Sequence, residues 1–119
     1  MKENIVKEKS FLFAKRIVKC CKFLQEHKKE FILSKQLLRS GTSIGAMIRE
    51  AEMAESKKDF IHKLYVGLKE ANEADYWIDL LKETGYIDSE NGNSLKEDCQ
   101  ELIKLLISIT KTMKSKINQ

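Results

Sequence analysis

Few residues of this chain have the types and spacing that metal or cofactor chemistry requires. Asp59 and His62 form an acid-x-x-His motif, which carboxylate-bridged metal sites in helical bundles use. Such a site needs two of these motifs and two further carboxylates, and the only other histidine is His27. Asp59 is also explained as a residue that caps a helix. The sequence therefore predicts no metal site and no cofactor.

The cysteines and glycines do not form a catalytic pattern either. Cys20 and Cys21 are adjacent, so on a helix their side chains diverge by about 100° and cannot pair as a C-x-x-C motif does. Neither they nor Cys99 have an evident His, Asp or Asn arrangement around them. Gly41-x-x-x-Gly45 is a close-packing signal without the lysine of a nucleotide-binding loop. We expect no catalytic residues and no enzyme.

Glutamates inside predicted helices could pair with arginines. Glu50, Glu70 and Glu73 lie well within helices, and Arg39 and Arg49 could pair with them. Buried pairs of this type more often fix helix register or a subunit contact than perform catalysis. Paired carboxylates that act on sugars need a cleft, and a bundle offers little room for one. We interpret these pairs as structural.

Basic residues form a candidate surface for nucleic acid or another partner. They lie on an outer face of the first predicted helix and at the start of the third: Lys15, Arg16, Lys19, Lys22, Lys57 and Lys58. Two lysines at a helix N-terminus oppose the helix dipole, which suggests an anionic partner. A surplus of lysine over arginine favours attraction to phosphates over base readout. The alternative is that these lysines only solvate helix faces.

The charge is unevenly divided along the chain. Residues 1–58 carry 14 Lys/Arg against 7 Asp/Glu, whereas residues 59–119 carry 8 against 11, within a net charge of +4. Such a division can steer a polyanion to the basic half, or pair copies of the chain head to tail.

Composition indicates a folded helical protein. There is no proline, only five glycines, 42% hydrophobic residues and 34% charged residues, so long helices are rarely interrupted. No apolar run approaches the ~20 residues of a membrane span, the N-terminus lacks a signal-peptide core, and three cysteines make no disulfide framework. We expect one domain over residues 1–119, located in the cytoplasm, with no membrane partner.

Hydrophobic spacing predicts four helices, at about residues 6–26, 35–55, 57–84 and 89–116. Ser34 is the expected N-cap of the second helix, and Ser56 with Asp59 forms a variant capping box before the third. Gly85 should end the third helix in the left-handed conformation, and Asp88 should cap the fourth. Short connections make neighbouring helices antiparallel, so the fold class is all-α, an up-down-up-down four-helix bundle.

Apolar residues at 4-3 spacing define the inner faces of these helices. In chain order they are Phe13, Ile17, Cys20 and Leu24; Leu37, Gly41, Ile44, Ile48 and Ala51; Phe60, Leu64, Gly67, Ala71, Ala74, Ile78 and Leu81; and Leu95, Cys99, Leu102, Leu106, Ile109 and Met113. The third stripe is small around Gly67, Ala71 and Ala74, so a neighbouring backbone can approach closely there.

Apolar residues also flank these stripes. The candidates for an oligomer interface are Phe11, Val18, Val66, Trp77, Leu105 and Ile107. Apolar flanks beyond one core stripe usually mark a subunit interface. The alternative is that wide stripes pack neighbouring helices of the same bundle.

The middle of the chain resembles a known family, the bacterial four helix bundle proteins, also described as proteins encoded in intervening sequences of 23S ribosomal RNA genes. The residues that carry the likeness are Leu38-Arg39-Ser40-Gly41-Thr42-Ser43-Ile44-Gly45-Ala46, Glu50, Ser56-Lys57-Lys58-Asp59-Phe60-Ile61, Leu68-Lys69-Glu70-Ala71-Asn72-Glu73, Tyr76-Trp77 and Thr84-Gly85-Tyr86-Ile87. The chain departs from many members at Met47, Arg49 and Ala51, where they have Asn, Ala and Gly.

The resemblance implies a homo-oligomer, a pentameric ring of bundles with no known catalytic activity. A similar layout occurs in accessory proteins of diversity-generating retroelements, whose basic pentameric barrel binds nucleic acid and a reverse transcriptase. We therefore expect a cytoplasmic, non-catalytic homopentamer that binds structured RNA or a nucleic-acid enzyme, as an adaptor associated with a reverse transcriptase or the ribosome. The alternative is a structural or protein-interaction oligomer that binds no nucleic acid.

Overall fold

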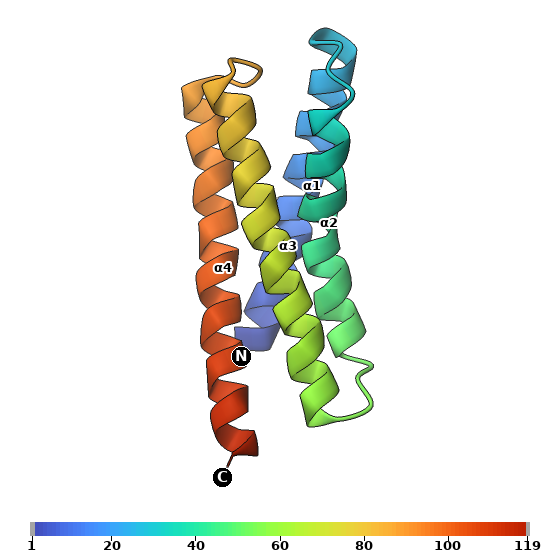
Figure 1. Cartoon of the computed structure of the whole chain (residues 1–119), viewed down its shortest axis with the longest axis vertical. Helices are drawn as coiled ribbons and strands as arrows, with labels where there is room; N and C mark the ends of the chain where they lie inside the picture. Colours follow the sequence, from blue (N-terminus) through green and yellow to red (C-terminus); the bar gives the residue numbers. More distant parts are fainter. Residues whose placement is uncertain (1, 119) are drawn as a thin grey trace.

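The computed structural model describes residues 2–118, and within them the chain forms four helices and no strand. They are α1 (Lys2–His27), α2 (Leu33–Ala51), α3 (Lys57–Glu83) and α4 (Ser89–Ile117). Successive helices run in opposite directions along a body of 51 × 22 × 19 Å (Figure 1). This confirms the predicted all-α, antiparallel four-helix bundle. The helices begin and end within about four residues of the predicted positions, at the level at which helix boundaries are generally uncertain.

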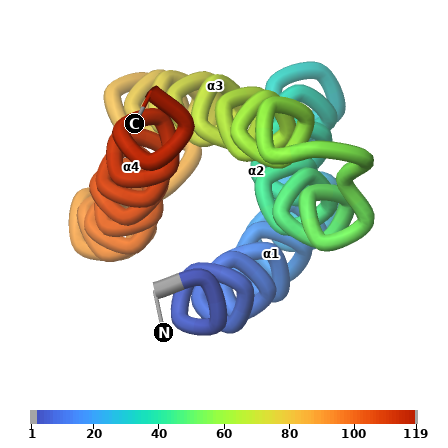
Figure 2. The backbone as a smooth tube through the Cα atoms, turned by 90° about the horizontal axis from the view of Figure 1, so that it is seen from below, coloured from blue at the N-terminus to red at the C-terminus, as the bar shows by residue number. Residues whose placement is uncertain are grey.

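Seen end-on, the helices follow one another around the bundle in chain order (Figure 2). The consecutive pairs α1–α2, α2–α3 and α3–α4 contact one another extensively, and α1 contacts α4 much less. The fourth side of the bundle is therefore its most open side.

The predicted inner faces form the core with one change of register. The stripes of α2, α3 and α4 are buried, apart from Phe60 and Met113, which are partly buried. In α1 the prediction for Cys20 is wrong, because Cys21 takes the core position and Cys20 is only partly buried. A helix of 3.6 residues per turn can continue its stripe at the third or the fourth residue. Here the Cys21 thiol points to α2 and donates a hydrogen bond to the Ser34 carbonyl, 3.3 Å away.

Close approach between helices occurs where the stripes contain glycine. A Cβ added to Gly67 would lie 3.6 Å from the Ile44 carbonyl oxygen and 3.5 Å from the Met47 Cβ, so the backbone of α2 reaches α3 there. A Cβ added to Gly41 would lie 2.9 Å from two carbons of Ile17, which leaves no room between α1 and α2. The small residues in the middle of the α3 stripe thus allow the close approach of a neighbouring backbone that the sequence predicted.

The start of α2 differs from the prediction. Ser34 is not its N-cap, because the helix already begins at Leu33 and the Ile32 side chain at the cap position makes no capping bond. The Glu30 carboxylate caps α2 instead. It accepts hydrogen bonds from the backbone N–H groups of Ile32, Leu33 and Ser34 at 2.7–3.1 Å. These bonds hold the pKa of Glu30 below its usual value despite its burial, since they stabilise the carboxylate.

The other helix ends follow the predicted signals. The Ser56 hydroxyl accepts a hydrogen bond from the Asp59 N–H, and Asp88 accepts one from the Asn91 N–H, so each caps its helix. Gly85 has φ +83°, and the N–H groups of Gly85 and Tyr86 bond to the carbonyls of Lys82 and Leu81. This is a Schellman motif, in which a left-handed glycine satisfies the last carbonyls of α3.

Candidate functional site

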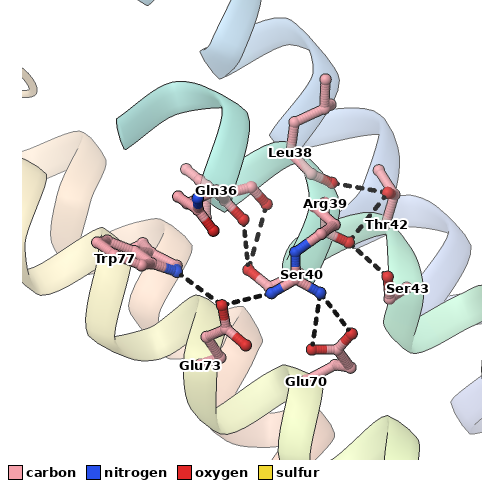
Figure 3. A network of polar contacts seen from close by, with 10 residues as sticks. Gln36, Leu38, Arg39, Ser40, Thr42, Ser43, Glu70, Glu73 and Trp77 are labelled. Carbon is pink, nitrogen blue, oxygen red and sulfur yellow. Dashed lines mark hydrogen bonds and ion pairs between the residues drawn. The ribbon is translucent and has the colours of Figure 1, made fainter. Parts of the chain in front are cut away.

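A polar network joins α2 to α3 through Arg39 (Figure 3). Its guanidinium donates to Glu70, 3.0 Å away, and to Glu73, which also accepts a hydrogen bond from the Trp77 indole N–H at 3.1 Å. Glu70, Glu73 and Trp77 share one face of α3 because they are three and four residues apart. The structure thus forms the pairs predicted for Arg39, whereas Glu50 pairs with Lys63 at 3.3 Å and not with Arg49.

The chemistry of this network is that of a structural clamp. Hydrogen bonds from Arg39 and then from Trp77 lower the pKa of Glu73, so this carboxylate is ionised at neutral pH and is a poor proton donor. The neighbouring hydroxyls of Ser40, Thr42 and Ser43 all donate to carbonyls of their own helix (Figure 3). None of these hydroxyls is paired with a general base, as a nucleophile would be.

A second polar cluster joins α3 to α4. The Lys96 ammonium lies 3.2 Å from Asp75 and 2.6 Å from Asp79, and these carboxylates raise the pKa of Lys96. The nearby Cys99 thiol donates to the Ala71 carbonyl at 3.2 Å. Burial raises the pKa of both Cys99 and Cys21 to about 12, so neither thiol forms a nucleophilic thiolate near neutral pH.

The residues considered for a metal site lie on two helices, His27 at the end of α1 and Asp59 with His62 in the first turns of α3. Asp59 accepts a hydrogen bond from the Glu55 N–H at the start of α3, as a capping residue does. The His27 ring packs against Phe23 at the end of α1, with 5.3 Å between ring centroids. Over residues 2–118, no three His, Cys, Asp or Glu side chains gather in a way that could hold a metal ion.

The predicted basic surface divides into three parts. Lys15, Lys19 and Lys22 are exposed along α1, and none of them forms an ion pair within residues 2–118. Arg16 is instead engaged with α4, where its Nη1 lies 2.6 Å from Asp98 and Nη2 donates to the Ser94 hydroxyl at 3.1 Å.

Two predicted lysines lie at the far end of the bundle. Lys57 and Lys58 are exposed at the start of α3, and Lys22 is exposed near the C-terminal end of α1. The start of α3 and the C-terminal end of α1 lie at opposite ends of the bundle (Figure 1). The structure therefore brings Lys15, Lys19 and Lys22 onto one surface, which we call the α1 basic face, and leaves the α3 pair apart.

The predicted interface residues also divide. Phe11, Val18 and Ile107 are 51%, 41% and 49% exposed. Val66, Trp77 and Leu105 are only partly buried, and the last two of these pack against the core of their own bundle. The structure thus leaves three apolar side chains on the surface and uses at least two of the others inside the bundle.

Phe11 is flanked by cations, which the sequence analysis did not foresee. The Lys15 ammonium lies 5.7 Å and the Arg49 guanidinium 5.4 Å from the centroid of its ring. Such contacts hold a cation near an exposed ring. The capping role of Glu30 and a cavity between α1 and α4 could not be predicted either, because both depend on how α1 ends and not on a periodic pattern.

In the part of the chain that the structure describes, no helix has the length and apolar character needed to span a bilayer.

The described residues define the class of protein: an all-α four-helix bundle whose ion pairs mostly join neighbouring helices. The chain belongs to the 23S rRNA-intervening sequence protein family, whose pattern matches residues 2–108. It is similar in structure to a protein of unknown function from the S23 ribosomal protein family of Bacteroides thetaiotaomicron, with 59% identity and a TM-score of 0.92. That match covers 93% of this chain and 99% of the other. No curated protein sequence matches the chain significantly.

Proposed function

We propose that this protein is a non-catalytic, cytoplasmic homo-oligomer that binds structured RNA through the α1 basic face. The observation that carries the proposal is the state of Lys15, Lys19 and Lys22, which are exposed on one helix and have no carboxylate partner among the described residues. Unpaired lysines that project from one rigid element attract a phosphate backbone without reading its sequence.

Self-association would strengthen this surface. The apolar side chains of Phe11, Val18 and Ile107 remain exposed on the single chain, and a ring of copies is what the family resemblance implies. Each added copy repeats the three lysines, so several weak contacts to one RNA combine into a higher overall affinity. We propose that this oligomer is a pentamer, because the resemblance to the family implies a pentameric ring.

The polar chemistry favours binding over catalysis. The carboxylates of Glu70, Glu73 and Asp79 are paired with cations, and two of the three thiols are buried with a high pKa. A catalytic acid, base or nucleophile needs a group left available to a substrate. The groups in these clusters are used to join helices.

A titration of labelled, structured RNA with nuclease-treated protein at several salt concentrations tests the proposal. We expect saturable binding whose log affinity falls linearly with log salt. The triple variant K15E/K19E/K22E should lose roughly tenfold or more in affinity and should reduce the salt slope by about three, one for each phosphate contact.

The matched control is K104E/K111E/K116E, which makes the same charge change at exposed lysines of α4. It should retain most of the affinity if the α1 basic face is the site. Equal losses in the two variants would mean that only net charge matters and would remove the assignment to α1.

The second candidate function is an oligomer that binds other proteins and no nucleic acid. Large apolar side chains outside the predicted flanks favour it, since Ile32 and Met53 are 76% and 85% exposed. Exposed apolar side chains of this size are common at protein interfaces. This candidate predicts no saturable RNA binding at physiological salt, together with an oligomer mass in light scattering that survives nuclease treatment.

A further inference from the structure

A cavity of about 570 Å³ lies between α1 and α4, at the end of the bundle where α3 turns into α4. The second half of α1, the turn of residues 85–88 and the first turns of α4 form its walls. Pockets that hold small molecules commonly enclose about 300–1,000 Å³. The cavity therefore has the volume of a small-molecule site and is too small for a folded partner.

One side of the cavity is apolar. Leu95 and Ile87 are buried members of the core and form part of its wall, and the Phe23 ring, 43% exposed, stands at its edge. Cys20 also lines it and is only partly buried, unlike the other two cysteines. A flat apolar group could remove this wall from water and gain the usual free energy of burial.

Among the charged side chains around the cavity, two cations have no carboxylate partner in residues 2–118. Arg16 is paired with Asp98, and Asp88 accepts hydrogen bonds from Asn91 as the cap of α4. Lys19 and Lys28 also line the cavity, and neither forms an ion pair within residues 2–118. The Lys28 ammonium lies 5.9 Å from the Phe23 ring centroid, so cation and apolar wall adjoin.

We propose that this cavity binds a small amphipathic anion, with its apolar body against Phe23, Ile87 and Leu95 and its acidic group on Lys19 and Lys28. The shared chemistry is a carboxylate, sulfonate or phosphate group attached to an aromatic or short aliphatic body. The charge complementarity selects an anion over a cation, and the adjoining apolar wall selects an amphiphile over inorganic phosphate. This proposal does not rest on RNA binding, although Lys19 belongs both to the cavity and to the α1 basic face.

Two fluorescent probes test the proposal on the full chain. Anilinonaphthalene sulfonate carries the acidic group, and N-phenyl-1-naphthylamine has the same aromatic body without it. We expect saturable binding of the sulfonate, tighter than that of the neutral probe. Inorganic phosphate should compete only weakly, because it lacks the apolar body.

Two substitutions separate the contributions of the lysine charge and of the apolar wall to probe binding. Lys28→Glu should weaken the sulfonate at least fivefold and change binding of the neutral probe less than twofold. Phe23→Ala should weaken both probes. Both side chains are exposed, so the variants should fold, and circular dichroism checks this. The matched control is Lys111→Glu, which reverses the charge of an exposed lysine of α4 outside the cavity and should leave both affinities unchanged.

Cys20 reports occupancy independently. Cys21 and Cys99 are buried, so a disulfide reagent should modify Cys20 first in the folded protein. Burial raises the pKa of the Cys20 thiol and Arg16 partly offsets this, so rates are compared at one fixed pH. Saturating sulfonate probe should slow modification at least fivefold, and Cys20→Ser should identify the reacting thiol.

Three results would overturn the proposal. Sulfonate binding that is unchanged in Lys28→Glu and Phe23→Ala would place the probe elsewhere. Absence of saturable sulfonate binding by the folded protein would exclude an amphiphile site. Without probe, Cys20 could be protected from the disulfide reagent and become reactive when the protein is diluted. If the protein mass in light scattering falls over the same dilution, a second copy covers the cavity. The two proposals can fail separately, because Lys28 lies outside the α1 basic face. Lys28→Glu should weaken the sulfonate probe and leave RNA binding unchanged, whereas K15E/K19E/K22E should weaken RNA binding.

Discussion

The α2–α3 and α1–α4 contacts of this bundle are built in opposite ways. At α2–α3 the backbones approach at Gly67, and the Arg39 network adds a clamp in which Glu70 is only 17% exposed. At α1–α4 the helices are joined by two ion pairs, Lys9–Glu101 and Arg16–Asp98, in which every side chain is more than a third exposed, and Arg16 also lines the cavity. A close backbone contact fixes the distance between two helices, whereas long charged side chains can follow a small shift of one helix against the other.

This difference separates stability from adaptability. Close packing of small residues resists change because interiors have little free volume. Exposed ion pairs contribute little to stability and are screened by salt. The α2–α3 contact is therefore the rigid one, and the α1–α4 side holds the cavity and its two lysines without a carboxylate partner, Lys19 and Lys28.

The largest expected effect comes from filling the close approach at Gly67. Gly67→Leu should lower the free energy of unfolding by about 3 kcal/mol, because its side chain would push against the Ile44 carbonyl and separate α2 from α3. Gly67→Ala is the control, and its Cβ makes only ordinary contacts. It should be neutral or stabilising by up to about 1 kcal/mol, since alanine is the better helix former. Urea unfolding measures both, and an undiminished stability of Gly67→Leu would break the comparison.

Removal of the clamp should have a smaller effect that depends on pH. Arg39→Ala should cost roughly 1 kcal/mol at neutral pH, because the guanidinium itself is half exposed. The folded pKa of Glu73 lies below its usual value of 4.5, so its contribution is present above that pH and is lost as pH falls through the folded pKa. The difference between wild type and Arg39→Ala should therefore shrink on acidification.

A pair between the same helices provides the control for the clamp. Lys63 and Glu50 form one ion pair without a third partner, so Lys63→Ala should cost less than Arg39→Ala. If both variants lose the same free energy of unfolding at neutral pH, the second carboxylate bound by Arg39 adds no stability beyond that of a single exposed ion pair.

The smallest expected effect belongs to the α1–α4 side. Arg16→Ala should cost roughly 0.5 kcal/mol at low salt and less at high salt, because both side chains of the Arg16–Asp98 pair are more than a third exposed. Unfolding at several salt concentrations measures this. A loss above about 2 kcal/mol, insensitive to salt, would show that α1–α4 carries stability as α2–α3 does, and would contradict the comparison.

Most of the fold could be predicted because it rests on local patterns. The 4-3 stripes, Ser56, Gly85 and Asp88 each act within a few residues. They have their predicted place in the structure apart from Cys20, and apart from Phe60 and Met113, which are only partly buried. The change from Cys20 to Cys21 arose because both positions fit a period of 3.6 residues. Glu30 could not be recognised as the cap of α2 because a glutamate that caps through its own loop lacks the usual Ser or Asp signal.

The candidate site was less accessible to sequence reasoning. The exposed state of Lys15, Lys19 and Lys22 follows from their spacing on one helix. The engagement of Arg16 does not, because Asp98 and Ser94 approach it from a distant part of the chain. The cavity depends in the same way on how α1 and α4 meet.

The order of contacts along the chain also has a consequence for folding during synthesis. The three extensive helix contacts all join consecutive helices, and only the α1–α4 ion pairs connect residues 82 and 92 positions apart. Local contacts form with little loss of loop entropy, so the chain should assemble helix by helix as it leaves the ribosome. Pulse-labelled hydrogen exchange that protects α4 before α3 would contradict this order. The cavity between α1 and α4 is then the last part to form, so a newly made chain would complete its α2–α3 contact before it could bind an amphipathic anion.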